Sequence, residues 1–90
     1  MHNYTITISK TAQKQLDDVP DDAAEKLIAA IRGLALHPRP AGYKKLKGRN
    51  GYRIIKGDYR ILYEIFDSVL VIDVIAIGHR KNIYKYRTSR

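Results

Sequence analysis

Residues 52–66, YRIIKGDYRILYEIF, decide the fold of this chain. Two strand-like runs flank a Gly-Asp step at 57–58, and a two-residue break of this kind is typical of a tight β-hairpin. The runs are rich in isoleucine and tyrosine, which favour extended backbone. The stretch therefore predicts two antiparallel strands whose pairing is set by the Gly-Asp loop.

That pairing sorts the side chains onto two faces, because successive residues of a strand point to opposite sides. One face is predicted to belong to the core: Tyr52, Ile54, Ile61, Tyr63 and Ile65. The other face carries Arg53, Ile55, Arg60, Leu62 and Glu64. Arg53 and Arg60 become diagonal neighbours about 7–8 Å apart, close enough for both guanidinium groups to reach one phosphate. The alternative is an Arg/Glu ladder on a solvated sheet, in which Glu64 neutralises the arginines.

The sequence on either side predicts the remaining elements. Residues 3–8, NYTITI, read as a strand, and Ser9 is placed to cap a short helix over 10–19. A longer helix is predicted within 20–38, with an apolar stripe at three-and-four spacing: Ala24, Leu27, Ile28, Ile31, Leu34 and Ala35. Pro38 and Pro40 end it.

Downstream, the period changes to that of strands. A short strand is predicted at 44–47, and a second two-residue break, Asp67-Ser68, precedes the apolar run VLVIDVIAIG at 69–78. The fold class is therefore α+β. An N-terminal strand and a two-helix hairpin pack on a three- to four-stranded antiparallel sheet.

Composition bounds the class of protein. Ninety residues fit one domain, 1–90, with a formal charge of +8. Residues 37–60 hold eight basic and one acidic side chain, so the positive field belongs to the middle of the chain. This favours a polyanionic partner such as nucleic acid, the alternative being a face charged only for solubility. The absence of cysteine excludes disulfides, and we expect a cytoplasmic protein because no signal peptide or membrane span is evident.

Further polar residues follow the last predicted strand. His79 is placed to donate or accept a proton near neutral pH, Arg80 to stabilise an oxyanion, and Tyr84 to orient a hydroxyl or stack on a base. The alternatives are a surface histidine and an aromatic packed at the core edge. The histidines are dispersed, so no metal site is expected, and no nucleotide-binding or serine-nucleophile motif occurs. Such a site suits attack of an RNA 2′-hydroxyl on the adjacent phosphate, with no cofactor.

The order of strand, helical hairpin, basic segment, YRIIKGDYRILYEI and IGHRKNIY resembles the RelE/ParE toxin superfamily of bacterial type II toxin–antitoxin modules. The resemblance runs from Tyr4 to about Tyr84, and the GHR-x-x-x-Tyr ending favours the RelE branch. It implies a microbial ribonuclease-like fold that cuts mRNA in the ribosomal A site, leaving a 2′,3′-cyclic phosphate and a 5′-hydroxyl. It also implies a RelB-like antitoxin bound in a heteromeric complex.

The resemblance assigns roles residue by residue. Arg53 and Arg60 match residues that hold the scissile phosphate, Arg80 matches one that stabilises the transition state, and Tyr84 matches one that orients the nucleophile. Better-known members place a lysine, proposed as the general base, where this chain has Ile55, so His79 or Tyr84 is left to take the proton, or ribosomal RNA and substrate geometry carry more of the catalysis. Residues expected to contact RNA or the ribosome are Lys44, Lys45, Lys47, Arg49, Lys56 and Lys81.

Two other functions stay open at this point. In the ParE branch of the superfamily the same fold binds DNA gyrase, and the arginines would then be surface charges. A non-enzymatic, basic RNA-binding module is the third reading, and Ile55 is the residue that favours it.

Overall fold

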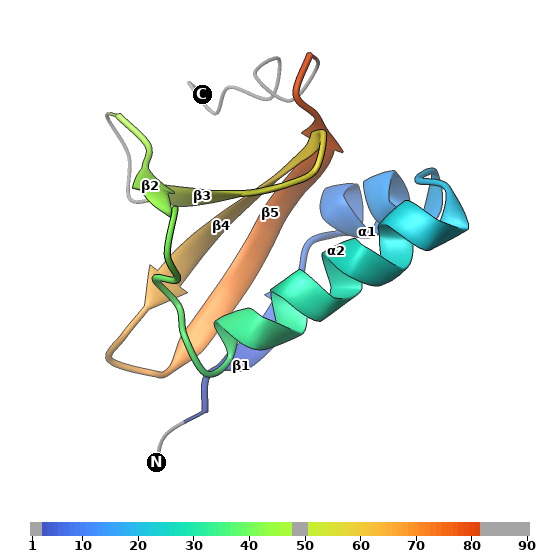
Figure 1. The fold of residues 1–90 in the computed structure, drawn as a ribbon. Coiled ribbons are helices and arrows are strands. Elements are labelled where there is room, and N and C mark those ends of the chain that lie inside the picture. Colours follow the sequence, from blue (N-terminus) through green and yellow to red (C-terminus); the bar gives the residue numbers. More distant parts are fainter. Residues whose placement is uncertain (1–2, 48–50, 82–90) are drawn as a thin grey trace.

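The computed structural model describes residues 3–47 and 51–81, which form two helices on one sheet (Figure 1). The strands run in the order β1-β5-β4-β3-β2 across the sheet. Their bounds are β1 Thr5–Ile8, β2 Lys44–Lys45, β3 Gly51–Lys56, β4 Tyr59–Phe66 and β5 Val71–His79. The helices are α1 Lys10–Asp17 and α2 Asp21–Leu34. Strands β2 to β5 are antiparallel, whereas β1 joins β5 in parallel, so the predicted α+β class is confirmed with a mixed five-stranded sheet.

The β3–β4 hairpin has the predicted register. Ile55 pairs with Arg60 and Arg53 pairs with Leu62. Gly57 opens the turn at φ +60°, which a glycine adopts without strain at the first central position of a type II′ loop. Because a two-residue loop allows one register, this turn decides which side chains lie on each face of the sheet.

The β4–β5 connection differs from the prediction. It is a four-residue loop, 67–70, and β5 begins at Val71 rather than at Val69. The amide of Leu70 donates to Asp67 O at 3.4 Å, and Leu70 itself lies at φ 56°. A leucine in the left-handed conformation is uncommon. Because no glycine stands at this position, the sequence did not indicate that the loop extends to Leu70.

A β-bulge in β5, opposite Leu62 and Tyr63, shifts by one residue which side chains of that strand face the core. Leu62 pairs with Ala76 but Tyr63 pairs with Val74, so Ile75 is the extra residue. Ser9 holds the outer side of the bulge, since its hydroxyl donates to Ile75 O at 2.8 Å. The bulge places Val74 and the next core residue, Ile77, on the same face of the sheet.

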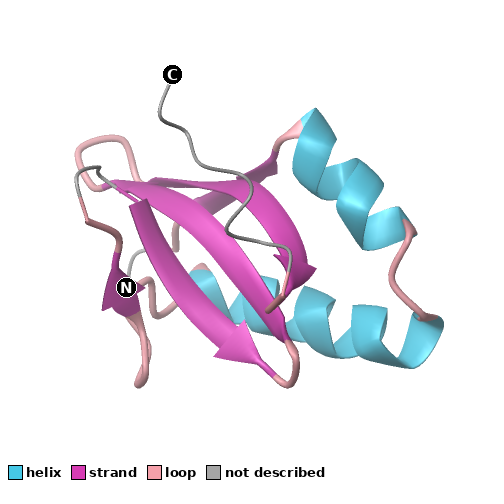
Figure 2. Ribbon diagram, turned by 90° about the horizontal axis from the view of Figure 1, so that it is seen from above, coloured by secondary structure: helices cyan, strands magenta, loops and turns pink. Residues whose placement is uncertain are grey.

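Both helices lie on one face of the sheet, and no described helix lies on the other face (Figure 2). Ser9 caps α1 as predicted, accepting from Ala12 N at 3.0 Å. The side chain of Gln15 in α1 accepts a hydrogen bond from the amide of Ile77 at 2.7 Å. This amide lies in the part of β5 that extends past the end of β1. The main core comprises Ala12, Leu16, Leu27, Ile31, Leu34, Ile54, Ile61, Tyr63, Ile72, Val74 and Ile77. Ile28, predicted to join the α2 stripe, is instead 36% exposed, because it lies at the edge of the helix's covered face.

Candidate functional site

The face of the sheet that points away from the helices carries the predicted arginines, and we call it the arginine face. Arg53 and Arg60 lie on it as diagonal neighbours, since the register pairs them with Leu62 and Ile55 respectively. Lys44 of β2 pairs with Arg53 and therefore lies on the same face. Cations at neighbouring sheet positions repel one another. Glu64 lies on the same face, as the alternative of an Arg/Glu ladder expected, but the three cations outnumber it, so the face still favours an anionic ligand.

Arg60 is the most informative residue of this face. Its Nε and Nη1 atoms are shielded from solvent, and neither has a hydrogen-bond partner among the described residues. Across from it, β5 places Gly78, which carries no side chain to compete for the guanidinium. Buried guanidinium nitrogens without acceptors are costly to fold, and an oxyanion would satisfy both of them.

A small apolar cluster lies beside the arginines. Leu62 and Ala76 are buried, and Leu46 and Ile75 pack against them. This cluster forms a packed apolar surface on the arginine face, against which the aliphatic stems of neighbouring side chains can pack. A rigid support of this kind restricts the positions that a guanidinium can take.

Arg80 lies where β5 leaves the sheet. Its amide donates to Asp58 O at 2.8 Å, which ties the strand exit to the tip of the β3–β4 hairpin. The side chain is exposed. Arg80 and Arg60 are thus delivered to the same end of the sheet by adjoining strands, as the meander predicted.

His79 is not brought together with the arginines. Strand β5 continues through His79, which pairs with Tyr59 and therefore lies on the helix side. Its ring lies edge-on to Tyr59 with 5.8 Å between the ring centroids, and its Nδ1 accepts the amide of Lys81 at 3.2 Å. The sequence placed the end of this strand at Gly78, whereas the strand runs through His79, so this side chain lies on the opposite face of the sheet from Arg60.

The remaining predicted contact residues are spread over two sides. Tyr84 and Arg49 lie outside the described residues. Lys45 pairs with Tyr52 and Lys56 with Tyr59, so both start from the helix side of the sheet. The side chains of all four described lysines of the basic segment, as well as of Lys81, are exposed: Lys44, Lys45, Lys47 and Lys56.

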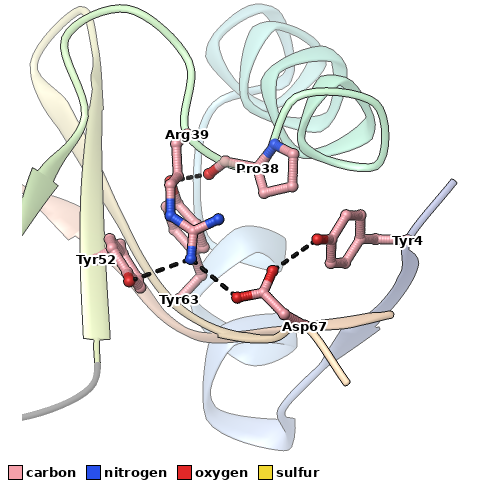
Figure 3. Close-up of polar contacts among 6 residues, drawn as sticks. All are labelled: Tyr4, Pro38, Arg39, Tyr52, Tyr63 and Asp67. Carbon is pink, nitrogen blue, oxygen red and sulfur yellow. Dashed lines mark hydrogen bonds and ion pairs between the residues drawn. The ribbon is translucent and has the colours of Figure 1, made fainter. Parts of the chain in front are cut away.

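A second polar cluster, which sequence reasoning missed, joins five segments on the helix side (Figure 3). Asp67 accepts from Arg39 Nη2 at 3.0 Å and from the Tyr4 hydroxyl at 2.6 Å. The Arg39 guanidinium lies 5.3 Å from the ring centroid of Tyr52. The Tyr63 hydroxyl donates to the carbonyl of Pro38 at 2.7 Å. The cluster fixes the α2–β2 connection, and no local motif could indicate it because its members are dispersed along the chain.

This cluster makes stability depend on acidity. The hydrogen bond from Arg39, followed by that from Tyr4, holds the pKa of Asp67 below its ordinary value of 3.8. A carboxylate with a lowered folded pKa stabilises the fold above its unfolded pKa, and this contribution is lost as the pH falls through the folded value. We expect the free energy of unfolding to fall less steeply below about pH 4 in Asp67→Asn than in the parent chain.

Urea titrations from pH 7 down to pH 2.5 measure this difference. Asp58→Asn, which removes a carboxylate at the hairpin tip, is the matched control and keeps the steeper fall. Parallel curves for Asp67→Asn and the parent chain would contradict the assignment.

The described residues contain no group of three or more His, Asp or Glu side chains arranged to hold a metal ion. Neither helix in the described part of the chain is both long and apolar enough to cross a membrane.

Comparison with known proteins identifies the family. Residues 6–84 match the model of the ParE toxin of the type II toxin–antitoxin system parDE. The chain belongs to the RelE/ParE superfamily of type II toxins. Toxin RelE of Mycobacterium tuberculosis is 29% identical over 93 residues, covering 99% of this chain and 94% of the relative. The resemblance drawn from the GDYR and GHR elements is thereby confirmed at the level of the superfamily.

Solved structures agree with this assignment. The toxin–antitoxin complex RelBE2 of M. tuberculosis has a chain with a TM-score of 0.80 and 25% identity, covering 89% of this chain and 94% of that one. The RelE–RelB complex of Pyrococcus horikoshii OT3 has one with a TM-score of 0.78 and 26% identity, covering 87% and 96%. Both structures are of complexes between a toxin and its antitoxin.

Proposed function

We propose that this toxin is a ribosome-dependent mRNA endonuclease of the RelE type, acting in the cytoplasm. The observation that supports this most directly is Arg60, whose buried Nε and Nη1 lack acceptors among the described residues and lie diagonal to Arg53. A phosphodiester supplies oxygens for both guanidinium groups. The exposed lysines Lys44, Lys45 and Lys47, together with Arg80 and Lys81, extend the positive field toward ribosomal RNA.

The reaction is transesterification within the substrate. The 2′-oxygen of a ribose forms a bond to the adjacent phosphorus, while the bond from phosphorus to the 5′-oxygen of the next nucleotide breaks. The proton of the 2′-hydroxyl passes to a base, and the departing 5′-oxygen gains a proton. The products are a 2′,3′-cyclic phosphate and a 5′-hydroxyl.

In this proposal the protein mainly stabilises charge. Arg53 and Arg60 hold the phosphate oxygens, and Arg80 reaches the charge that develops on the phosphorane or the leaving oxygen. Ile55 supplies no titratable group, and His79 faces the helix side. Tyr84, outside the described residues, is the remaining predicted group for orienting the nucleophile. Electrostatic stabilisation and the geometry imposed by the ribosome then account for most of the rate.

A cognate antitoxin is part of the same proposal. The neighbouring structures are toxin–antitoxin complexes, and the strongly basic segment 37–60 is suited to an acidic segment that folds on binding. An antitoxin that covers Arg53 and Arg60 would neutralise the cations that the substrate needs.

The match to a ParE toxin model gives a second candidate, inhibition of DNA gyrase. Two assays on purified protein separate the candidates: mapping of mRNA 5′-ends on programmed ribosomes, and gyrase supercoiling. We expect cuts within codons that require translation, and no effect on supercoiling. Gyrase inhibition without mRNA cuts would overturn the proposal.

The variant Arg80→Ala sharpens the same assay. Its expected result is a fall in cleavage of about 100-fold, since one charge-stabilising group is lost. Arg32→Ala is the matched control, because Arg32 is an exposed arginine on α2, on the other side of the molecule. Equal activity in both variants would remove Arg80 from the site.

A further inference from the structure

Three tyrosines form a ladder from the core to the surface on the helix side of β3. Tyr63 is fully buried, and the Tyr52 ring stacks on it with 5.9 Å between centroids and 28° between planes. The Tyr43 ring contacts Tyr52 at 5.9 Å with a tilt of 46°, and Tyr43 is 40% exposed. The outermost ring is therefore supported from below by packed aromatic rings while part of its own surface remains open.

The lower part of the ladder is fixed by polar contacts (Figure 3). Arg39 lies over the Tyr52 ring, donates to its hydroxyl at 3.4 Å and pairs with Asp67. The Tyr63 hydroxyl is held by the carbonyl of Pro38. The anchored rings of Tyr52 and Tyr63 support the Tyr43 ring that packs on them. Stacking of an aromatic ligand on Tyr43 therefore costs little side-chain entropy.

A tight turn presents Tyr43. Its amide donates to Pro40 O at 3.0 Å, which closes a four-residue turn. Gly42 occupies the third position at φ +88°, the left-handed conformation that a type II turn requires there. A Cβ at Gly42 would meet no atom within 4 Å, so the glycine is needed for backbone conformation rather than for space.

The segment that carries Tyr43 is positively charged. Lys44, Lys45 and Lys47 follow it directly, and residues 38–57 contain no Asp or Glu. Lys44 pairs with Arg53, so β2 connects Tyr43 to the arginine face around the edge of the sheet. An exposed aromatic ring beside cations is the arrangement that binds single-stranded nucleic acid, since bases stack on the ring and phosphates contact the lysines.

We propose that Tyr43, Lys44 and Lys45 form a subsite for one unpaired base of single-stranded RNA and its phosphate, next to the arginine face at the β2 edge of the sheet. The proposal rests on the proposed function, because RNA is the substrate of that activity. The base stacks on the open surface of Tyr43. Lys44 contacts the phosphate that leads toward Arg53, and Lys45 contacts the phosphate on the helix side.

Binding of short single-stranded RNA to the full chain tests this subsite. The RNA carries 2′-O-methyl groups, so it lacks the nucleophile and stays uncut, and a matched abasic strand supplies phosphates alone. Stacking of a base is expected to make the base-bearing strand bind about 5- to 100-fold tighter than the abasic strand. Tyr43→Leu, which keeps an apolar cover over Tyr52, should lose most of this advantage, whereas Tyr43→Phe should retain it.

Two further variants separate stacking from charge. Lys44→Ala should lower the salt dependence of binding by about 0.7 in the slope of log K against log salt, whereas Tyr43→Leu leaves the slope unchanged. Phe66→Ala is the aromatic control. Phe66 is 44% exposed at the last position of β4, on the opposite face of the sheet from Tyr52, so its loss should not alter binding.

Equal binding of both strands to the parent chain, or unchanged binding by Tyr43→Leu, would overturn the subsite. The assay involves neither ribosomes nor cleavage, so its outcome is distinct from that of the mRNA-cutting experiment. Tight base-dependent binding without mRNA cleavage would refute only the nuclease proposal.

Discussion

Arg60→Met is expected to abolish most mRNA cleavage and at the same time to leave the fold at least as stable as that of the parent chain. Methionine keeps the apolar stem that packs on the sheet but removes the guanidinium. Loss of one preorganised group that stabilises transition-state charge costs about 100- to 1,000-fold in rate. Measurement of mRNA cleavage on programmed ribosomes tests the expected loss of activity.

The stability half follows from the burial of Arg60. Its Nε and Nη1 are shielded from solvent without acceptors among the described residues, so folding strips water from them without replacing it. A buried donor left in this state costs about 1–3 kcal/mol, and Met carries no such donor. Urea unfolding should therefore give Arg60→Met an equal or higher free energy of unfolding.

Phosphate supplies a second readout on the same residue. An anion that binds the native state raises its stability with the logarithm of 1 + [L]/Kd, so sodium phosphate should raise the Tm of the parent chain more than that of Arg60→Met. Arg32→Met on α2 serves as the matched control and should respond to phosphate like the parent chain. Full cleavage by Arg60→Met, or a fall of more than about 1 kcal/mol in its unfolding free energy, would contradict this account.

The sequence was sufficient for the hairpin because its information is local. A Gly-Asp loop permits one register, and that register alone placed Arg53 and Arg60 on one face and Ile54 and Tyr63 on the other. The Ser9 cap is local in the same sense, since it acts on an amide three residues away.

What the sequence could not indicate depends on distant contacts. The bulge at Ile75 is held by Ser9, 66 residues earlier, and β5 extends through His79 because Tyr59 of the hairpin pairs with it. Alternation of apolar residues cannot reveal an inserted residue when both Ile75 and Ile77 suit a core position. The strand runs one residue beyond the predicted end at Gly78, and element boundaries are the feature that sequence patterns define least well.

Arg39 illustrates the same limit at a charged residue. From the sequence it is one of eight basic residues in 37–60. In the fold it forms an ion pair with Asp67 of the β4–β5 loop, and it belongs to the scaffold rather than to the arginine face. Charge counts therefore overestimate the cations that remain available to RNA.

Tyr63→Ala is expected to have the largest effect on stability. Tyr63 is fully buried between Tyr52 and the core, and its hydroxyl holds the Pro38 carbonyl. Removal of a buried aromatic ring costs about 3–5 kcal/mol, a large part of the 5–15 kcal/mol that stabilises a typical domain. Urea unfolding should show the loss, and Phe66→Ala, at an exposed aromatic on the same strand, should cost far less.

Tyr63→Phe separates the hydroxyl from the ring. Burial raises the pKa of Tyr63 from 10.0 to about 12, so the folded chain keeps this phenol neutral where the unfolded chain ionises. The stability that depends on the neutral phenol is complete below pH 10 and is lost as the pH rises from 10 to 12, by up to about 1.4 kcal/mol per pH unit. Tyr63→Phe should lack this component while losing about 0.5–1.5 kcal/mol at neutral pH with its hydrogen bond. If the alkaline loss persisted unchanged in Tyr63→Phe, another group would have to be its source.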